Sequence, residues 1–356
     1  MVSVYRTANI DDAPDRTLFD ESYVGGMSID DDMLFLDGVN ANDTVLDVVW
    51  DQYHEDADTD LSPACERGLL LNIVVLSSPG NVIRRSAIRG TWGQDSFNGN
   101  PPRYRTFFLI GRGGLNGSIL ESVESESKIH GDILIGNYVD TYRNLSVKVL
   151  HGMSWVWRHC RPKYYLKTDD DCFVDPDVIA GDLALRDSTA WRKNHLYVGC
   201  KIENAEVHRN PTHRWYVSRQ DYPHMRYPPY ASGFGYLLSY HTLSDVVHKA
   251  AMRHPFPVED AYLGVLASLV GVYPVDSSNF VNPSTTNSSL LAIEPCHRPY
   301  VVHGVDNPQN QYVYHQIAAE SKKCKWRVFI QGKRQARVPQ NLLRSRKANV
   351  RKMDAS

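Results

Sequence analysis

The chain has 356 residues, of which 42% are hydrophobic and 22% are charged. This composition lies in the ordinary globular range and excludes collagen, a coiled coil and a wholly disordered chain. The sequence contains no run of the roughly 18 to 20 apolar residues that a membrane-spanning helix needs. Its N-terminus also lacks the basic and apolar sections of a signal peptide. We therefore expect a folded protein with a substantial core.

The net charge of −2 is unevenly distributed along the chain. Residues 1–60 hold 16 acidic residues against two arginines, whereas Lys322–Lys352 holds 12 basic residues and no acidic one. We expect residues 1–62 to form an acidic, stem-like or disordered segment, residues 63–320 to form one domain, and residues 321–356 to form a basic tail. Binding of a polyanion through this tail is an alternative, although few aromatic residues are present there to stack on bases.

From residue 65 onward, apolar runs alternate with amphipathic segments. In chain order we predict Leu69–Ser77 as a strand, Asn81–Trp92 as a helix, Arg105–Gly111 as a strand, Ile119–Lys128 as a helix, Asp132–Tyr138 as a strand, Asn144–Trp157 as a helix and Lys163–Thr168 as a strand. This order is typical of an α/β protein with a parallel sheet. In the more irregular second half we predict strands at Leu196–Cys200 and Tyr236–Ser239 and helices at Thr242–Met252 and Glu259–Val270.

Three adjacent acids, Asp169, Asp170 and Asp171, follow the strand predicted at Lys163–Thr168. The carboxyl ends of strands are where open α/β sheets bind ligands. Adjacent carboxylates repel one another, so either full solvation or a bound cation keeps them ionised. The EF-hand pattern is absent, and a divalent cation that joins the protein to a diphosphate fits better. The alternative is the polar start of a helix at Asp175-Pro176.

Arg85, Arg89 and Trp92 fall on one face of the first predicted helix. Two guanidinium groups and an indole suit a phosphate or a nucleotide. The alternative, equally compatible with the spacing, is a solvated face with Trp92 packed in the core.

Two further candidates have ordinary structural explanations. Glu259 and Asp260 open a predicted helix, where the helix dipole favours acidic residues in any case. His303 lies at the end of an apolar strand that we predict from Tyr300, and Gly304 follows it in a turn. A lone histidine in such a place is more often structural than a ligand. Both need context before a function can be assigned.

The cysteines and glycosylation sequons give weaker signals. Six cysteines form no CxxC pair, which argues against a structural zinc site or a catalytic dithiol and permits up to three disulfides. Four Asn-x-Ser/Thr sequons are compatible with a glycosylated protein of the secretory pathway. They lie at Asn42, Asn116, Asn144 and Asn287.

Five sequence blocks, taken together and in this order, resemble the β-1,3-galactosyltransferase family, which also includes β-1,3-N-acetylglucosaminyltransferases. The blocks are Leu71–Gly93 (LNIVVLSSPGNVIRRSAIRGTWG), Gly131–Ser146 (GDILIGNYVDTYRNLS), Tyr164–Asp175 (YYLKTDDDCFVD), Tyr227–Ser239 (YPPYASGFGYLLS) and Val258–Gly264 (VEDAYLG). The resemblance covers roughly Leu69 to Tyr312. The acidic segment and the basic tail lie outside it.

The resemblance implies a GT-A fold, with a Rossmann-like nucleotide half and a mixed acceptor half. It implies a catalytic domain at residues 63–320 that transfers a sugar from a UDP-sugar to the 3-hydroxyl of an acceptor sugar, with inversion. The cofactor implied is Mn²⁺, with Mg²⁺ as the alternative. The family consists of type II Golgi membrane proteins, so the resemblance also implies a position in the Golgi lumen and a membrane anchor. This chain contains no such anchor, and we expect an incomplete N-terminus or a luminal fragment.

Specific roles follow from the resemblance for eight residues. Asp171 and His303 would hold the metal, and Asp260 would be the catalytic base. Asp169 and Asp170 would face the nucleotide ribose and the donor sugar. Arg85, Arg89 and Trp92 are assigned to the nucleotide side.

The function expected is therefore that of a hexosyltransferase, namely β-1,3 transfer of galactose from UDP-galactose to a glycan on a protein or lipid. We expect no nucleic-acid partner. Transfer of N-acetylglucosamine or N-acetylgalactosamine is one alternative. A non-catalytic, glycan-binding homologue is another, which the retention of Asp171, Asp260 and His303 argues against.

Overall fold

The structure is a computed structural model that describes residues 62–66, 68–94, 104–188, 195–283 and 298–330. The acidic segment predicted at the N-terminus lies outside these ranges. So do the sequons at Asn42 and Asn287, and the basic chain after residue 330.

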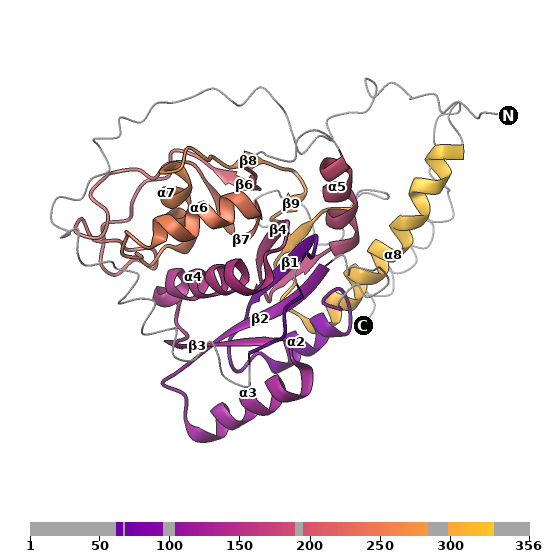
Figure 1. The fold of residues 1–356 in the computed structure, drawn as a ribbon, viewed down its shortest axis with the longest axis horizontal. Coiled ribbons are helices and arrows are strands. Elements are labelled where there is room, and N and C mark those ends of the chain that lie inside the picture. The colour runs from indigo at the N-terminus through magenta and orange to yellow at the C-terminus, as the bar shows by residue number, and fades with distance from the viewer. Residues whose placement is uncertain (1–61, 67, 95–103, 189–194, 284–297, 331–356) are drawn as a thin grey trace, which may run out of the picture.

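The main sheet contains seven strands of the described chain, in the order β3-β2-β1-β4-β7-β6-β8 (Figure 1). Their bounds are β1 Leu71–Leu76, β2 Tyr104–Gly113, β3 Ile133–Val139, β4 Tyr164–Asp169, β6 Tyr197–Ile202, β7 Tyr230–Ser239 and β8 Val275–Asp276. Each strand predicted from the sequence is present, although β7 begins six residues earlier than expected.

The first four strands of this order form a parallel half. β1 pairs in parallel with both β2 and β4, and β2 pairs in parallel with β3. All six residues of β1 are buried, as expected for a central parallel strand that is covered on both faces. The parallel sheet predicted from the order of the segments is confirmed.

The other half of the sheet is mixed. β7 runs antiparallel to β4, β6 runs antiparallel to β7, and β8 runs parallel to β6. The α/β fold expected from the sequence, a Rossmann-like half joined to a mixed half, is confirmed. β4 is the strand at which the two halves meet.

Helices cover both faces of the sheet (Figure 1). One face packs on α4 (Leu145–Trp155), α6 (Tyr240–Ala250) and α7 (Glu259–Ser268). The other face packs on α2 (Val82–Arg89), α3 (Gly117–His130), α5 (Pro176–Ser188) and α8 (Pro308–Ile330). Short helical turns η3 (Tyr142–Asn144) and η4 (Val156–Cys160) flank α4. Strand β1 therefore supplies alternate residues to two hydrophobic cores.

A second, smaller sheet carries the end of the folded domain. It is formed by β5 (Cys172–Val174), β10 (Val301–His303) and β9 (Phe280–Val281), with β10 in the middle. β10 runs antiparallel to β5 and places His303 opposite Cys172. This pairing joins two segments that lie about 130 positions apart in the sequence, and it positions the site described below.

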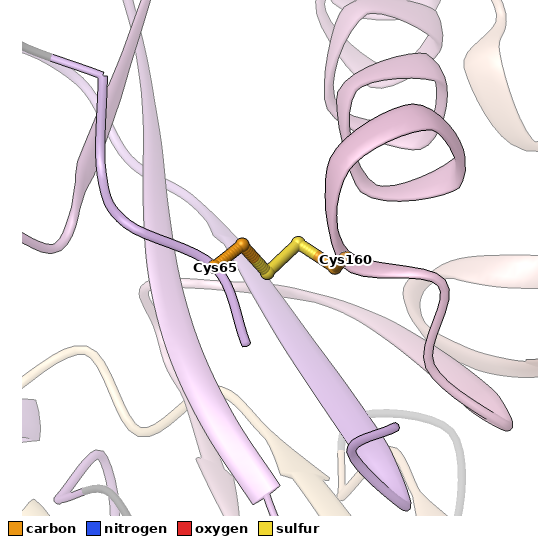
Figure 2. The surroundings of a disulfide bond; sticks show 2 residues. All are labelled: Cys65 and Cys160. Atoms are coloured by element: carbon orange, nitrogen blue, oxygen red, sulfur yellow. A yellow bond between two sulfur atoms is a disulfide. The ribbon is translucent and has the colours of Figure 1, made fainter. Parts of the chain in front are cut away.

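A disulfide between Cys65 and Cys160 joins the segment before β1 to the end of η4 (Figure 2). Among the described residues, Cys172 and Cys200 are free thiols. The sequence allowed up to three disulfides and did not indicate this pairing.

One helix runs past an expected boundary, and another begins where the sequence offered a helix start. Helix α8 continues to Ile330 and crosses the boundary that we placed at residue 321. Asp175 and Pro176 do begin a helix, α5, because an Asp175 side-chain oxygen accepts a hydrogen bond from the Val178 amide. No helix in the described part of the chain is long and apolar enough to cross a membrane.

Candidate functional site

The three adjacent acids lie at the carboxyl edge of the parallel half, where the sequence placed them. Asp169 is the last residue of β4, and Asp170 and Asp171 form the turn into β5. The Asp170 amide donates to the Leu76 carbonyl at 3.1 Å, which ties the turn to the end of β1. Ligands of open α/β sheets bind at this edge.

Asp171 and His303 face one another at this edge. The Val305 amide donates to the Asp171 carbonyl at 2.6 Å, and Gly304, with φ of +78°, allows the chain to turn directly after His303. The His303 Nε2 lies 3.8 Å from Asp171 Oδ2, and each side chain is about one-third exposed. Partial burial and the nearby Asp169 carboxylate raise the pKa of Asp171, while His303 acts in the opposite direction.

This pair fits a divalent cation shared with a substrate. Both side chains are open to solvent; a carboxylate is a ligand type that suits Mn²⁺ and Mg²⁺, and an imidazole is a common ligand of divalent transition metals. No cluster of three or more possible protein ligands occurs within the described ranges. Mn²⁺ and Mg²⁺ commonly take one or two protein oxygens and complete their coordination with phosphate oxygens and water. A cation held by this pair would therefore need further oxygens, from phosphate or water, to complete its coordination.

Asp170, which we expected to face the nucleotide ribose or the donor sugar, binds protein side chains instead. Its carboxylate is almost buried and accepts hydrogen bonds from Ser77 Oγ at 2.7 Å, Asn81 Nδ2 at 2.8 Å and Arg84 Nη1 at 2.9 Å. These donors come from the end of β1 and the start of α2, so Asp170 fixes the acidic turn to α2. Of the two acids assigned to the donor side, only Asp169 has a substantially exposed carboxylate, at 34%.

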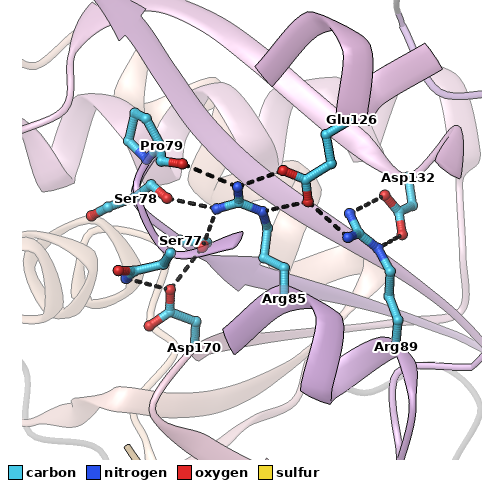
Figure 3. Close-up of polar contacts among 9 residues, drawn as sticks. Ser77, Ser78, Pro79, Arg85, Arg89, Glu126, Asp132 and Asp170 are labelled. Atoms are coloured by element: carbon cyan, nitrogen blue, oxygen red, sulfur yellow. Dashed lines mark hydrogen bonds and ion pairs between the residues drawn. The ribbon is translucent and has the colours of Figure 1, made fainter. Parts of the chain in front are cut away.

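Arg85 is fully buried and surrounded by protein acceptors (Figure 3). Its guanidinium donates to both carboxylate oxygens of Glu126 at 2.9 and 2.6 Å. It also donates to Ser77 Oγ and to the carbonyls of Ser78 and Pro79. Arg85 therefore holds the loop after β1 in place. From the sequence we considered either a nucleotide contact or a solvent-exposed face for this residue, and its buried position differs from both.

Arg89 extends the same network (Figure 3). It binds Asp132 with two hydrogen bonds of 2.7 and 2.8 Å and donates to Glu126 at 2.7 Å. Burial alone would raise the pKa of Glu126, but hydrogen bonds from Arg85 and Arg89 lower it. This side chain joins α2 to α3 and to the loop before β3, which differs from the nucleotide role assigned to it.

Trp92 is packed in the core, as the alternative explanation of its helix face proposed. Only 3% of it is exposed, and its indole N–H donates to Gln311 Oε1 at 2.8 Å. The Gln311 amide in turn donates to the carbonyls of Cys172 and Val305. Trp92 and Gln311 thus connect α8 to the turns on either side of the Asp171–His303 pair.

Arg84 is a site residue that the sequence argument missed. Its side chain is 32% exposed, and Nη1 lies 2.9 Å from Asp170 Oδ1. Burial would lower the pKa of Arg84, but the hydrogen bond to Asp170 raises it, so the guanidinium stays charged at the edge of the acidic turn. The sequence feature that could have indicated Arg84 is the pair Arg84-Arg85. Adjacent helix positions point in different directions, so when Arg85 faces the core, Arg84 faces away from it.

Asp260 occupies the second position of α7, close to the same edge. Its Oδ2 accepts a hydrogen bond from the Gly233 amide at 3.0 Å, and its Oδ1 accepts one from the Ala261 amide at 2.9 Å. The residue is partly exposed. Burial raises its pKa, and the two amide hydrogen bonds act in the opposite direction. A carboxylate held by two amides with a raised pKa has the properties of a general base.

Glu259, directly before Asp260, is buried. Its Oε1 accepts a hydrogen bond from the Tyr236 hydroxyl at 2.6 Å, and its Oε2 lies 3.4 Å from Lys167 Nζ. Burial raises the pKa of Glu259 to about 7, although Lys167 opposes this shift. The sequence left Glu259 without a role.

Lys167 connects the two acidic regions. This β4 side chain is 2% exposed, and its ammonium group lies 2.9 Å from Asp169 Oδ1. It also donates to the carbonyl of Gly233, whose amide holds Asp260. Burial would lower the pKa of Lys167, but Asp169 and Glu259 outweigh it and raise the pKa. One buried cation thereby links β4, β7 and α7.

A pocket of about 500 Å³ opens at the carboxyl ends of β1, β2 and β3. Its lining combines apolar side chains with Asp140, which accepts a hydrogen bond from the Gly111 amide and pairs with Lys148 at 2.7 Å. The lining residues are Pro79, Gly80, Val82, Gly113, Gly114, Leu115, Ser118, Ile119, Ser122, Val139 and Asp140. This volume and composition are typical of a small-molecule site.

Comparison with known proteins gives one consistent result. The sequence model described as Galactosyltransferase matches residues 83–278, more than half of the chain. Beta-1,3-galactosyltransferase 1 of Homo sapiens is 30% identical over 261 residues, which cover 72% of this chain and 76% of that protein. Beta-1,3-galactosyltransferase 4 of Rattus norvegicus is 35% identical over 230 residues, which cover 57% of this chain and 61% of that protein.

Solved structures give a much weaker likeness. The crystal structure of the galactosyltransferase LgtC with donor and acceptor sugar analogs overlaps 70% of this chain and 95% of its own, with a TM-score of 0.34 and 10% identity. We take no residue roles from this overlap.

Proposed function

This chain belongs to the galactosyltransferase family and is a hexosyltransferase, and we propose that it is an inverting, metal-dependent β-1,3-galactosyltransferase. In this proposal the donor is UDP-galactose, and the acceptor is the 3-hydroxyl of a sugar in a glycan on a protein or lipid. The choice of donor and linkage is supported by the two β-1,3-galactosyltransferases at 30% and 35% identity. We also propose a position in the Golgi lumen, which the resemblance of the five sequence blocks implies.

The observation that carries the proposal is the presence of two separate acidic sites at one edge of the sheet. Asp171 lies 3.8 Å from His303, while Asp260 is held by the Gly233 amide. Lys167 contacts both Asp169 and the Gly233 carbonyl. An inverting transfer needs two separate sites, one for the leaving diphosphate and one for the attacking hydroxyl, because these groups lie on opposite faces of the sugar.

The donor would lie along this edge. We assign its nucleoside to the pocket of about 500 Å³ that Asp140 lines, and its diphosphate to the opening beside Asp171, His303 and Arg84. A bound Mn²⁺ ion would neutralise the negative charge that develops on the diphosphate. The partly exposed guanidinium of Arg84 adds a second positive charge at the same place.

Asp260 would act as the base. In a single displacement the acceptor 3-hydroxyl forms a bond to the anomeric carbon as the bond to UDP breaks, which inverts the configuration. The hydroxyl proton passes to the Asp260 carboxylate. A base placed in this way contributes about 10²- to 10⁴-fold to the rate. The Gly233 and Ala261 amides fix the carboxylate and leave further lone pairs on its oxygens for this proton.

The test is release of UDP by the purified protein from UDP-galactose, UDP-N-acetylglucosamine and UDP-N-acetylgalactosamine, with Mn²⁺ or EDTA, across a panel of acceptor sugars. We expect Mn²⁺-dependent turnover of UDP-galactose, and a product in which the new bond is β-1,3.

Other outcomes separate the alternatives. Turnover of an N-acetylhexosamine donor in place of UDP-galactose would contradict our choice of donor and leave the transferase assignment intact. Equal turnover in EDTA would contradict the metal. Glycan binding without turnover of any donor would favour the non-catalytic homologue.

A further inference from the structure

The long connection between β6 and β7 is an ordered arm, which we define as residues 203–227. Arg209 lies at its centre and donates hydrogen bonds to the carbonyls of Val217, Ser218, Tyr222 and His224. Isolated bridges pair Glu206 with Arg226 and His208 with Tyr216. The two terminal nitrogens of this guanidinium bind four carbonyls and so fix the path of the backbone, which lets the arm present side chains in defined positions.

The arm exposes a group of aromatic rings. Trp215 is 45% exposed. The rings of His208 and His213 stack with centroids 3.8 Å apart, and each centroid lies 5.5 Å from that of Trp215. The two imidazoles support one side of the indole, while much of the rest of the ring remains open to solvent.

This aromatic group lies against Tyr142, which follows β3. The Arg214 guanidinium carbon lies 4.2 Å from the centroid of the Tyr142 ring. The side chains of Arg214 and Trp215 also hydrogen-bond to Tyr142, whose pKa is raised by burial and by the Asp260 carboxylate. Asp260 acts in the same way on Tyr230. Tyr142 follows β3 at the carboxyl edge of the sheet, so the arm reaches the reaction side of the molecule.

We propose that Trp215 and Arg214 form the acceptor subsite, in which the C–H face of a pyranose ring stacks on the exposed indole and a sugar hydroxyl accepts a hydrogen bond from Arg214. This inference rests on the proposed function and names the part of the chain that selects the acceptor. A pyranose has an apolar face and a polar rim. An indole beside a guanidinium matches both features, because the ring supplies flat apolar area and the guanidinium supplies donors.

The position of the subsite fits its task. The acceptor hydroxyl must reach Asp260, and Trp215 hydrogen-bonds to Tyr142, which follows β3 at the carboxyl edge of the sheet. The indole N–H is used in holding the ring against Tyr142, which leaves the flat face of the ring, rather than its polar edge, for the sugar.

The test compares Trp215→Ala, Trp215→Phe and Arg214→Ala with the unaltered protein, using methyl glycosides of galactose, N-acetylglucosamine and N-acetylgalactosamine as acceptors. Methyl glycosides are chosen because they carry no aromatic group that could stack by itself. We expect Trp215→Ala to raise the acceptor KM about tenfold, with a change in the KM for UDP-galactose of less than about twofold. Trp215→Phe should recover most of the loss. Trp157→Phe is the matched control, because Trp157 hydrogen-bonds to Ser244 and lies outside the arm.

An unchanged acceptor KM in both Trp215→Ala and Arg214→Ala would overturn the subsite. An equal rise in the KM values for donor and acceptor would also overturn it, because that result indicates a general loss of structure. If Trp215→Ala fails to fold, Arg214→Ala and Trp215→Phe decide the question.

Failure of the proposed function would be recognised separately. If the unaltered protein turns over no donor, the same glycosides are titrated while tryptophan fluorescence is recorded. A fluorescence change that disappears in Trp215→Phe and persists in Trp157→Phe supports the subsite, and persistence in both contradicts it.

Discussion

Lys167 is buried within β4, and its ammonium group faces the carboxylates of Asp169 and Glu259. The same group donates to the Gly233 carbonyl. A buried charge is tolerated only when it is paired and hydrogen-bonded, and here each partner belongs to a different part of the site. Lys167 therefore holds the acidic turn, β7 and α7 in one arrangement without itself facing solvent.

Replacing Lys167 by Met should destabilise the protein by about 3 to 5 kcal/mol, because Asp169 and Glu259 lose their common cation and Glu259 remains buried. Urea unfolding measures this change. Lys128→Met, at an exposed position in the last turn of α3, is the matched control and should change the stability by less than about 0.5 kcal/mol. Equal midpoints for the two variants would show that Lys167 does not hold the site together.

Glu259 gives the protein a defined dependence of stability on pH. Its pKa is about 7 in the folded chain against an ordinary value of 4.5, so between these values the folded state holds a proton that the unfolded state releases. The contribution of this group is present in full below pH 4.5 and is lost as the pH rises through 7. We expect Glu259→Gln to remove this fall from the pH profile of the unfolding free energy, and an unchanged slope would contradict the assignment.

The sequence identified some site residues and misplaced others for a physical reason. Helical spacing placed Arg85, Arg89 and Trp92 on one face of a helix, but α2 ends at Arg89 and Trp92 lies in the turn after it. The spacing also could not reveal that the two arginines meet Glu126 of α3 and that Arg89 meets Asp132. Arg84, one position away, reaches the edge instead. From the sequence we assigned no role to Lys167. It lies within the strand segment YYLKTD, and periodicity does not show what a buried polar residue will contact.

At the scale of elements, Gly233 of β7 faces the two acids that begin α7. A Cβ built at this position would lie 3.2 Å from Glu259 Oε2 and 3.4 Å from Asp260 Oδ2. Gly233→Ala should therefore displace the proposed base and lower kcat by at least about tenfold, while the KM for UDP-galactose changes little.

The control for this variant is Gly181→Ala in α5. A Cβ at Gly181 meets no atom within 4 Å, and the substitution should be neutral or stabilise the protein by up to about 1 kcal/mol. Steady-state kinetics and thermal unfolding of both variants make the comparison. A Gly233→Ala enzyme with a normal kcat would show that Asp260 does not need this position.

The Cys65–Cys160 disulfide closes a loop over 95 positions of the sequence. It fastens the chain before β1 to the end of η4 (Figure 2). Reduction should cost about 2 to 5 kcal/mol of stability, because the unfolded chain gains freedom. Urea unfolding with and without a reductant measures the loss, and Cys160→Ser should be insensitive to the reductant. Identical curves for the oxidised and reduced protein would contradict the prediction.

Long, regular elements were predictable, and most short ones were not. The strands of the parallel half are runs of six or more residues, and their order along the chain indicated a parallel sheet. β10 (Val301–His303) was also expected, as an apolar strand that ends at His303. β5 and β9 have two or three residues each, which is too short for periodicity to be seen. The pairing of β10 with β5, which brings His303 to Asp171, therefore required the structure.

At the scale of the whole molecule, β4 lies between a parallel half and a mixed half. It pairs with β1 in parallel and with β7 in antiparallel fashion. The acidic turn leaves β4 at the end that faces the pocket, and β7 carries Gly233 against the start of α7. In our proposal the donor binds on the side of the parallel half and the acceptor on the side of the mixed half. This arrangement follows from the position of β4 between the two halves.

The start of α8 packs on the rest of the folded domain. Tyr314 of α8 stacks on Phe173 of β5 with ring centroids 5.5 Å apart, and Gln311 hydrogen-bonds to the turns around the site. These contacts make the start of α8 part of the domain. The basic composition after residue 321 favoured a tail, because charge alone does not indicate where a helix ends.

The central claim is that Asp171 holds a cation for the donor diphosphate while Asp260 serves only the reaction. The measurement that tests it most directly is calorimetric titration of UDP into the unaltered protein, Asp171→Ala and Asp260→Asn, each with Mn²⁺ and with EDTA. We predict Mn²⁺-dependent binding in the unaltered protein and in Asp260→Asn, which should also lose turnover, and binding weakened at least about tenfold in Asp171→Ala. Equal binding of UDP by Asp171→Ala, or loss of binding in Asp260→Asn, would contradict this account.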